Sequence, residues 1–378
     1  MKKINLMYLY SAKGFGGIVR NLSLIVNNLN KDIFDITVVS LANKGDKNSV
    51  INIAQNCNAK FLTIVDAKKL HLTTLAKIKE CIMSYKIDIL SCHGYKADIY
   101  GFCLARFFKY HGKLVTMKHG WVTPGIKFQA YHTLDKFLTK WFDITILVSE
   151  GQRKEIASFD ISPHKTIVIN NAIDSTDCTE RIDRDSIRQR FNINKKDYVV
   201  GMVGRLSGEK DIKTALYAIA KLLRMNNNAK LIIVGEGPSN KNLMKTAKSL
   251  GIENNVTFLG YQPNVSEIYS IMDLYISCSL KEGLPNSVLE AQQQGVPCIV
   301  TDISGNNDIV KDGINGFLIK PKTPEILFKK ILILMEDQKL AKSFVIEGQK
   351  TIKNKFSLEK RIKKLENLYY QLAGTISR

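Results

Sequence analysis

Short apolar segments alternate with amphipathic helical patterns along nearly the whole chain of 378 residues. An apolar segment at residues 4–9 is followed by a helical pattern, and the same order restarts at residues 198–203, ahead of a helix predicted at 212–225. This alternation predicts mainly parallel sheets, because two parallel strands must be joined by a long crossover, which is usually a helix. We therefore expect an α/β fold.

A polar and charged segment at residues 175–185 separates the two alternations. The chain is long enough for two domains, each with a core of its own. We expect a first domain at residues 1–178, a second at 179–356 and a terminal helix at 357–378. The two halves share no motif, which predicts two sheets that face a cleft rather than a tandem repeat.

The composition, with 45% apolar and 24% charged residues, is that of a globular protein. No run of 18 apolar residues occurs, and the N-terminus leads directly into a predicted strand without the pattern of a signal peptide. We therefore expect the protein in the cytoplasm. The seven cysteines include no Cys-x2-Cys pair, which argues against both a disulfide framework and a zinc site.

The formal net charge of +20 calls for an anionic partner or substrate. There are 24 basic and 13 acidic residues before position 175, and 31 and 22 from there onward, so the excess is spread over both halves. Nucleic acid is not an expected partner, because the chain has no zinc-finger spacing, RNA-binding signature or basic-region heptad. An anionic membrane surface and a polyanionic substrate fit the charge equally well.

Residues 282–297 have the pattern of a helix that begins at a ligand. A β-rich segment at 274–279 leads into them, and Pro285 suits a first helical turn, where its missing N–H is no loss. Gly295 and Pro297 then end the helix. A strand, a tight loop and a helix N-terminus together favour an anion, because free N–H groups and the helix dipole face one point.

Two glutamates flank this predicted anion site. Glu282 lies just before the helix and Glu290 about two turns along it, so each can reach a different part of one ligand. A nucleotide-sugar, with phosphates in the middle and hydroxyls at both ends, is such a ligand. Taken alone, the spacing is equally consistent with a helix-capping residue and an unrelated surface residue.

Glycines and histidines mark strand ends in the first half. Gly14, Gly16 and Gly17 follow the first predicted strand without forming the dinucleotide fingerprint, so they indicate either a loop for an anionic ligand or a tight turn. His93 and His119 each end a predicted strand and precede a glycine. Ligands of open α/β sheets bind at such ends, although a structural role is the simpler interpretation of either histidine.

An ordered series of motifs spans about 120 residues of the second half. They are Gly-Arg-Leu-x-x-Glu-Lys from Gly204, Val-Gly-Glu-Gly-Pro from Val234, Phe-Leu-Gly from Phe258, Glu-Gly-Leu-Pro-x-x-x-x-Glu-Ala from Glu282, Thr-Asp-x-x-Gly-Asn from Thr301 and Asp-Gly-x-Asn-Gly-Phe-Leu from Asp312. The series resembles that of retaining glycosyltransferases of family 4, the glycosyl transferases group 1. The first half matches the family at the Gly-Gly loop, at His119-Gly120 and at residues 148–150 and 171–174. One departure is Asp211, where many relatives carry glycine.

The resemblance implies a GT-B fold, in which two Rossmann-like domains face a cleft and the last helix crosses back to the first domain. By position, the family's catalytic residues would be Arg205, Lys210, Glu282 and His119. Arg205 and Lys210 would bind the diphosphate, Glu290 would bind the ribose and Glu282 the sugar. Other donor-binding positions implied by the family are Gly16, Gly17, Phe258, Gly283, Leu284, Pro285, Asn286 and Ser287. His119 resembles the family histidine that contacts the transferred sugar. No cofactor and no metal are expected.

The implied activity is the transfer of a sugar, such as a hexose, from a nucleoside diphosphate donor to a glycan or polyprenyl-linked glycan, in the biosynthesis of a bacterial surface polysaccharide. Pre-positioned cations would stabilise the charge that develops on the leaving diphosphate. We expect attack on the same face of the sugar, with a two-step route through Glu282 as the competing mechanism. The rival functions are a nucleotide-sugar epimerase of the same fold and a nucleotide-binding protein without catalysis.

Basic and aromatic residues are interleaved in the first half, at Phe107, Phe108, Lys109, Lys127, Phe128, Lys136, Phe137, Lys140 and Trp141. This pattern predicts peripheral docking on an anionic bilayer, on the inner face of the cell membrane, where a lipid-linked acceptor would be reached. Core aromatics with solvated lysines are the alternative interpretation.

Overall fold

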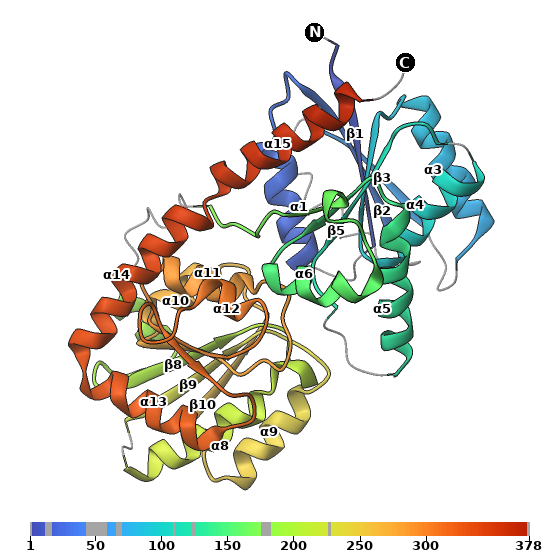
Figure 1. Cartoon of the computed structure of the whole chain (residues 1–378). Helices are drawn as coiled ribbons and strands as arrows, with labels where there is room; N and C mark the ends of the chain where they lie inside the picture. The colour runs from blue at the N-terminus through green and yellow to red at the C-terminus, as the bar shows by residue number, and fades with distance from the viewer. Residues whose placement is uncertain are drawn as a thin grey trace. The chain divides into compact units, whose positions relative to one another are not determined.

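The computed structural model describes residues 2–11, 17–42, 59–65, 70–108, 110–121, 126–174, 183–225 and 228–375. The chain forms two compact units (Figure 1). The first contains the described residues up to Asn171, together with the last helix, and the second contains the described part of Ala172–Ser357. The predicted boundary between residues 178 and 179 lies outside the described residues, and the second division falls between Ser357 and Leu358.

The described part of the first unit is built on a parallel sheet in the order β3-β2-β1-β4-β5-β6-β7. Its strands are β1 (Ile4–Tyr10), β2 (Phe34–Ala42), β3 (Lys60–Val65), β4 (Ile89–His93), β5 (Lys113–Lys118), β6 (Ile144–Leu147) and β7 (Thr166–Val168). The central strands are buried along most of their length, as expected when helices cover both faces of a parallel sheet.

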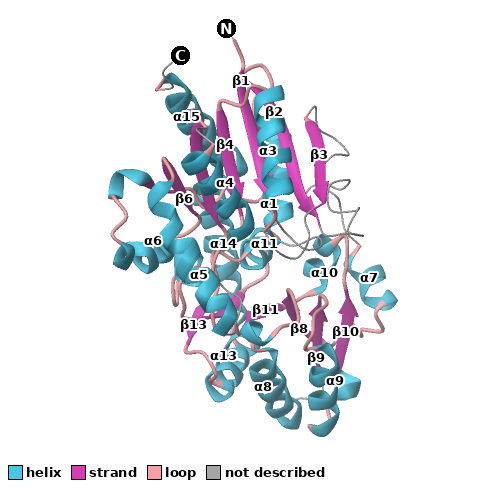
Figure 2. Ribbon diagram, turned by 90° about the vertical axis from the view of Figure 1, so that its right-hand side faces the viewer, coloured by secondary structure: helices cyan, strands magenta, loops and turns pink. Residues whose placement is uncertain are grey.

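The helices of this unit are α1 (Gly17–Asn28), α3 (Leu72–Ser84), α4 (Tyr95–Phe107), α5 (Ile126–Leu138), α6 (Glu150–Ile156) and α15 (Leu358–Gly374). Figure 2 shows helices in front of the sheet and behind it. Side chains of β1 alternate between the two layers. Met7 and Leu9 belong to the apolar cluster that α3 and α4 complete, whereas the hydroxyl of Tyr8 lies 3.4 Å from that of Tyr369 on α15.

The last helix therefore belongs to the first unit, as predicted. It packs against α1, and the guanidinium of Arg361 donates a hydrogen bond of 2.9 Å to Oδ1 of Asn21. Arg361 and Tyr369 are buried on the same side of α15, whereas the charged residues at 359, 360, 363 and 364 are exposed.

The second unit contains a parallel sheet in the order β10-β9-β8-β11-β12-β13. Its strands are β8 (Tyr198–Val203), β9 (Ala229–Val234), β10 (Val256–Gly260), β11 (Leu274–Ser277), β12 (Cys298–Thr301) and β13 (Phe317–Ile319). Its helices are α7 (Arg184–Arg190), α8 (Ile212–Met225), α9 (Asn240–Ser249), α10 (Val265–Ile271), α11 (Asn286–Gln293), α12 (Asn306–Ile309), α13 (Pro324–Glu336) and α14 (Gln338–Lys355). The predicted α/β fold with two Rossmann-like sheets is confirmed.

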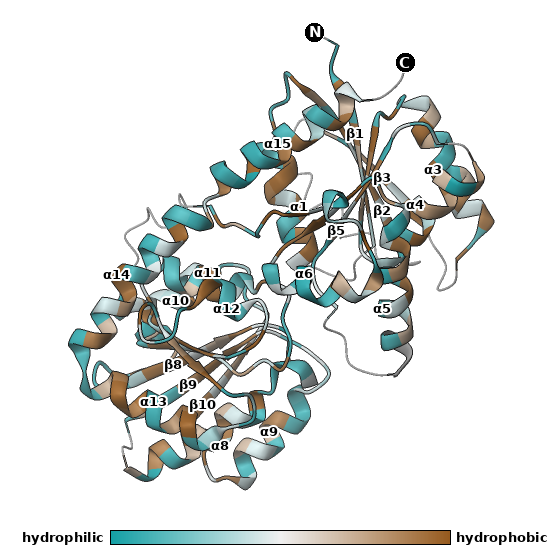
Figure 3. Ribbon diagram, in the orientation of Figure 1, coloured by the Kyte–Doolittle hydropathy of each residue, from teal (hydrophilic) through white to brown (hydrophobic). Residues whose placement is uncertain are grey.

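Helix α8 shows how the sequence pattern sets this fold. It begins and ends at the predicted residues, Ile212 and Met225. Apolar side chains at positions 212, 216, 219 and 222 are buried in the core of the second unit, and Figure 3 shows the alternation of hydrophobic and hydrophilic residues along the helices. Burial of one such side chain stabilises the fold by about 1.5–3 kcal/mol, so the apolar face of α8 determines how the helix lies on the sheet.

Candidate active site

The strand order of the second sheet reverses between β8 and β11. The two strands are parallel neighbours, so the loops that follow them leave the sheet at the same edge and diverge there. Such a switch point is where open α/β sheets bind ligands. The loop after β8 carries Arg205 and Lys210, and the loop after β11 carries Glu282, so the structure brings three predicted site residues to one edge.

A short 3-10 turn, η6 (Gly208–Lys210), follows β8 and places Lys210. The next residue, Asp211, has a φ of 41° in the left-handed region, so the glycine that the resemblance implies there would be free of strain. Aspartate is among the few residues that tolerate this region, and its Oδ2 also accepts a hydrogen bond of 2.7 Å from Oγ1 of Thr214. The departure from the family pattern therefore leaves the turn intact. Arg205 is exposed to solvent.

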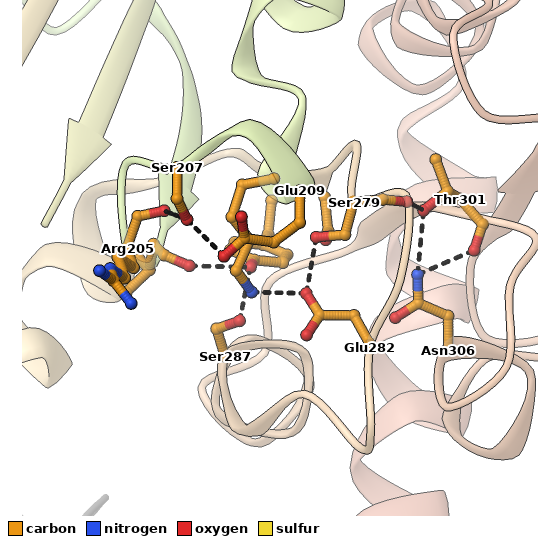
Figure 4. A network of polar contacts seen from close by, with 12 residues as sticks. Arg205, Ser207, Glu209, Ser279, Glu282, Ser287, Thr301 and Asn306 are labelled. Carbon is orange, nitrogen blue, oxygen red and sulfur yellow. Dashed lines mark hydrogen bonds and ion pairs between the residues drawn. The ribbon is translucent and has the colours of Figure 1, made fainter. Parts of the chain in front are cut away.

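Lys210 and Glu282 form an ion pair between the two loops. The Nζ atom lies 2.5 Å from Oε1 of Glu282, and the side chains are only 21% and 9% exposed. Oε1 also accepts a hydrogen bond of 2.6 Å from Oγ of Ser279 (Figure 4). Because the pair is largely shielded from water, its attraction is stronger than that of a surface salt bridge. The side chain of Glu282 is thereby held in place, with both contacts on the same oxygen.

A second layer of hydrogen bonds supports Ser279. Its carbonyl accepts from Oγ1 of Thr301 at 2.6 Å, and Nδ2 of Asn306 donates to the Thr301 carbonyl at 2.8 Å (Figure 4). Ser279, Thr301 and Asn306 are buried, so these bonds are protected from competing water. The network ties the loop after β12 to the loop that carries Glu282.

A glycine lets the same two loops approach closely. Gly305 has a φ of 89°, and a Cβ atom there would lie 2.5 Å from the carbonyl oxygen of Gly283. Any side chain at this position would push the loops apart, because the obstacle is backbone. The Gly305-Asn306 pair of the family motif therefore has a packing reason in this chain.

Helix α11 begins at Asn286, with Pro285 as the N-cap residue. The proline thus lies one position before the predicted first turn, and Glu290 lies just over one turn along the helix rather than two. The N–H groups of Asn286 and Ser287 have no acceptor within the helix and are available to a ligand. Leu284 and Pro285 are buried, and the buried Oδ1 of Asn286 has no hydrogen-bond partner among the described residues.

Two buried tyrosines hold the polar residues of α11. The hydroxyl of Tyr269 donates to Oε2 of Glu290 at 3.0 Å and also lies 3.1 Å from the carbonyl of Ser287. The hydroxyl of Tyr275 donates to Oγ of Ser287 at 2.8 Å. Burial raises the pKa of Tyr275, which keeps its hydroxyl protonated as a donor. Glu290 is 8% exposed, so it keeps a narrow access to solvent from a rigid position.

Phe258 lies on the edge strand β10, two strands from β8. It is half-buried and packs against the core of the second unit. Its predicted contact with the donor stays a prediction.

The predicted residues of the first unit are His119, Gly16 and Gly17. Gly16 lies outside the described residues. Gly17 is the exposed first residue of α1, and its carbonyl accepts a hydrogen bond of 2.9 Å from Nδ2 of Asn21. His119 follows β5, and its Nε2 lies 3.1 Å from Nδ1 of His93 at the end of β4. The two histidines singled out in the sequence therefore meet at one edge of the sheet.

Both histidines are kept neutral. Burial, followed by the charges of Arg361 and Lys118, lowers the pKa of His119 to about 3. Burial, His119 and Arg361 likewise lower the pKa of His93 well below its usual value. The Nδ1 atom of His119 is buried and has no hydrogen-bond partner among the described residues. An unprotonated ring with one unsatisfied nitrogen is suited to hydrogen bonding with a ligand rather than to carrying charge.

A chain of polar groups supports this pair. Oγ of Ser91 lies 3.1 Å from Nε2 of His93, and Ser91 also hydrogen-bonds Tyr369 of α15, which contacts Tyr8. Sequence reasoning missed these supporting residues, as it missed Ser279, Tyr269 and Tyr275. Thr301 and Asn306 belong to the Thr-Asp-x-x-Gly-Asn motif, so the sequence did single out the segment that contains them.

The chain is similar to known proteins over most of its length. Residues 15–177 match the family model described as Glycosyltransferase Family 4, and residues 183–351 match the model described as Glycosyl transferases group 1. Together the two models cover most of the chain. The match includes all of the second-unit motifs from Gly204 to Leu318.

Two similar proteins have named activities or roles. The UDP-Gal:alpha-D-GlcNAc-diphosphoundecaprenol alpha-1,3-galactosyltransferase of Escherichia coli is 27% identical over 317 residues, which cover 80% of each chain. The capsular polysaccharide biosynthesis glycosyltransferase CapM of Staphylococcus aureus is 24% identical over 260 residues, which cover 65% of this chain and 66% of CapM.

The crystal structure of Anabaena HepE in complex with UDP-glucose has a TM-score of 0.85 to this chain at 21% sequence identity. The match covers 97% of this chain and 100% of HepE. It shows that the two chains share the GT-B fold.

Proposed function

The chain belongs to glycosyltransferase family 4, the glycosyl transferases group 1, and on this basis we propose that it transfers a hexose with retention of the anomeric configuration from a nucleoside diphosphate donor to a glycan acceptor. The use of a nucleotide-sugar donor follows from family membership. The sugar, the stereochemistry and the acceptor are the parts proposed here.

The observation that carries the proposal is the shielded Lys210–Glu282 pair at the β8–β11 switch point. A diphosphate and a sugar are linked by one bond, so a donor site must offer a cation and a hydroxyl acceptor within a few ångströms of each other. Lys210 and Glu282 meet this requirement, with Arg205 exposed on the same loop. The start of α11 adds N–H groups for phosphate oxygens, and Glu290 offers a carboxylate for ribose hydroxyls.

The residues act on the charge that moves during the reaction. Breaking the bond between sugar and phosphate places negative charge on the leaving diphosphate. Arg205, Lys210 and the N-terminus of α11 stabilise this charge most strongly when it is fully developed, which lowers the barrier. The hydrogen bonds from Ser279 to Glu282 and from Tyr269 to Glu290 hold the acidic side chains in place before the donor arrives.

Glu282 suits a binding role better than a nucleophilic one. Its Oε1 receives both the ammonium of Lys210 and the hydroxyl of Ser279, and these donors withdraw negative charge from the carboxylate. Oε2 is left to accept hydrogen bonds from a sugar. Attack of the acceptor on the same face of the sugar, with the leaving phosphate taking the acceptor's proton, therefore needs no further group from this chain.

For the acceptor we propose a polyprenyl-linked glycan used in a bacterial surface polysaccharide. The support is the undecaprenol-linked acceptor in the name of the Escherichia coli relative and the capsular role in the name of CapM. The described part of the chain contains no helix with the length and apolarity needed to cross a bilayer. Access to such an acceptor would then depend on peripheral association with an anionic membrane surface.

A donor panel and a product assay test the proposed function. Thermal unfolding is measured with UDP, GDP, UDP-glucose and UDP-galactose, and the stabilising donor is then incubated with a diphosphoundecaprenol-linked GlcNAc. We expect an α-linked disaccharide product, with the configuration read from the anomeric coupling constant by NMR. An inverted product, a covalent glycosyl–Glu282 intermediate, or an epimerised donor without transfer would each contradict the proposal.

A further inference from the structure

Helix α5 and the 3-10 turn that follows it, η2 (Thr139–Trp141), carry a stripe of large apolar side chains on the solvent side. Tyr131, Leu134, Phe137 and Trp141 recur at helical spacing and are each between 41% and 47% exposed. Apolar residues that are exposed singly are normal, but a continuous row of four is not.

Helix α4 extends this stripe into a broader surface. The ring of Tyr95 stacks on that of Tyr131, with 5.4 Å between the ring centres. The ring of Phe102 lies edge-on to that of Trp141, with 5.2 Å between the ring centres. Phe107 is 67% exposed, and its ring lies edge-on to that of Phe102 with 6.3 Å between the ring centres. Figures 1 and 3 show α4 and α5 side by side. We refer to Tyr95, Phe107, Tyr131, Leu134, Phe137 and Trp141 as the aromatic surface.

The opposite side of α5 is firmly attached to the unit, so the exposure of the stripe is not the result of a loose helix. Asp135 and Leu138 are buried, and Asp135 accepts hydrogen bonds of 2.8 Å from Lys118 and 2.7 Å from Nε1 of Trp121. These interior contacts fix the rotation of α5. The aromatic stripe must then point to the outside.

The charges around the aromatic surface have one predominant sign. The acidic residues of α4 and α5, Asp98 and Asp135, both point inward to Lys118 and are buried. The other charged side chains described on these elements are mainly basic, namely Lys96, Arg106 and Lys140. Lys136 is paired with Glu155 at 2.7 Å, and Asp143 accepts a hydrogen bond from the N–H of Leu114. Nζ of Lys140 lies 5.6 Å from the ring centre of Phe137, so a cation accompanies the stripe itself.

From this combination we propose that the aromatic surface docks on the headgroup region of an anionic lipid bilayer. Aromatic rings with a polar edge settle at the boundary between headgroups and acyl chains, and adjacent lysines and arginines are attracted to anionic lipid. A protein partner fits less well, because protein interfaces are depleted in lysine. The net charge of +20 acts in the same direction. This inference rests on the membrane-linked acceptor of the proposed function and adds the surface of the first unit that would contact the bilayer.

The chain offers an internal probe for the test, because it contains two tryptophans and Trp121 is only 4% exposed. The emission of Trp141 is recorded as vesicles of phosphatidylglycerol and phosphatidylcholine in equal parts are added to the full chain at low salt. We expect a blue shift and co-sedimentation with these vesicles. Vesicles of phosphatidylcholine alone should bind at least tenfold more weakly, and the Trp141→Phe variant should lose the spectral shift but keep most of the sedimentation.

Two double variants distinguish docking through the aromatic surface from nonspecific adsorption to vesicles. Leu134→Ser with Phe137→Ser should weaken the partition into anionic vesicles at least tenfold, whereas Tyr217→Ser with Met244→Ser, which removes exposed apolar residues of the second unit, should leave it unchanged. Circular dichroism and UDP binding confirm that each variant is folded. Equal partition of both variants, absence of binding to anionic vesicles, or a concentration-dependent dimer abolished by Leu134→Ser would overturn the proposal. UDP binding without vesicle binding would reject the docking and leave the proposed use of a nucleotide-sugar donor standing.

Discussion

The Nδ1 atom of His93 lies 3.1 Å from the Nε2 atom of His119, and the remaining nitrogen of His119 has no partner among the described residues. Since both rings are neutral, one must donate to the other, and the tautomers are coupled. When Ser91 donates to His93 and His93 donates to His119, the proton of His119 is placed on Nδ1, where it can be offered to a sugar hydroxyl. The tautomer of the predicted sugar-contacting histidine thus depends on a neighbour.

Replacing His93 with phenylalanine should therefore impair transfer without weakening nucleotide binding. The variant keeps the ring but removes the partner of Nε2, so we expect kcat to fall about tenfold, as for the loss of one oriented hydrogen bond. The UDP dissociation constant should stay within twofold, because the predicted nucleotide contacts belong to the second unit. His111→Phe, at an exposed position, is the matched control. Equal kcat values for the His93 variant and wild type would contradict the prediction.

The same pair predicts an acid-sensitive fold. An unfolded histidine binds a proton below a pH of about 6.5, but His93 resists protonation in the folded chain because its pKa is well below that value. The free energy of unfolding should therefore fall as the pH drops below 6.5, with His93 adding about 1.4 kcal/mol per pH unit to the slope. Urea unfolding of wild type and His93→Gln between pH 7 and pH 5 measures this slope. A variant as acid-sensitive as wild type would show that His93 does not contribute.

The Lys210–Glu282 pair predicts coupled effects on activity. Lys210→Gln should lower kcat/KM about 100-fold, because it removes a cation that stabilises the leaving diphosphate. Glu282→Gln keeps the shape but weakens both the ion pair and the hydrogen bonds to sugar, so we expect a smaller loss, about tenfold. The double variant should lose less than the product of the two, since the residues contact each other. Strictly multiplicative losses would mean that the pair does not act together.

Tyr269 predicts a combined effect on stability and donor binding. Tyr269→Phe leaves the buried Glu290 without one of its donors, which should lower the stability of the second unit by about 1–3 kcal/mol. UDP binding should weaken as well, because Glu290 loses its fixed orientation. Tyr261→Phe, at an exposed position, should change neither quantity. Denaturant unfolding and calorimetric titration with UDP measure the two effects.

A buried triad in the first unit gives a prediction on stability alone. Lys118 contacts Asp98 at 2.9 Å and Asp135 at 2.8 Å, and all three are buried. Burial raises the pKa of Asp98, whereas Lys118 and further hydrogen bonds lower the pKa of Asp135. Lys118→Met should therefore destabilise the unit by about 3–5 kcal/mol, since it leaves buried carboxylates without a cation.

The two aspartates of this triad should differ in their tolerance of asparagine. Asp98 is the carboxyl that holds a proton more readily, so Asp98→Asn should cost less stability than Asp135→Asn. Urea unfolding of the two variants is the measurement. A larger loss for Asp98→Asn would show that the charge resides on Asp98 instead.

The features that could be predicted from sequence are those with a local cause. Helix α8 was predicted to the residue because its apolar period runs from Ile212 to the end, and strand β8 kept its predicted bounds at residues 198–203. The ends of strands are less well predicted. The β-rich segment at residues 274–279 forms a strand only over Leu274–Ser277, and Ser279 instead donates a hydrogen bond to Glu282.

The parts of the site that were missed depend on contacts between distant segments. The meeting of His93 and His119 requires the register that pairs β4 with β5, in which His93 lies opposite Met117. Tyr269 reaches Glu290 from the helix before β11, and Tyr369 reaches Tyr8 across 361 positions. No local sequence pattern indicates which distant segments come into contact. The glutamates and cations of the proposed donor site were found because they belong to motifs. Among their supporting residues, Thr301 and Asn306 also lie within a motif, whereas Ser279, Tyr269 and Tyr275 do not.

The central claim is that Arg205 and Lys210 hold the diphosphate of a nucleotide-sugar, and titration calorimetry with UDP tests it most directly. Arg205→Gln and Lys210→Gln should each weaken UDP binding about tenfold or more, since a charge-assisted hydrogen bond contributes about 1.5–3 kcal/mol. Lys213→Gln, an exposed lysine on α8, should bind UDP like wild type. A folded double variant of Arg205 and Lys210 that binds UDP with wild-type affinity would contradict the account.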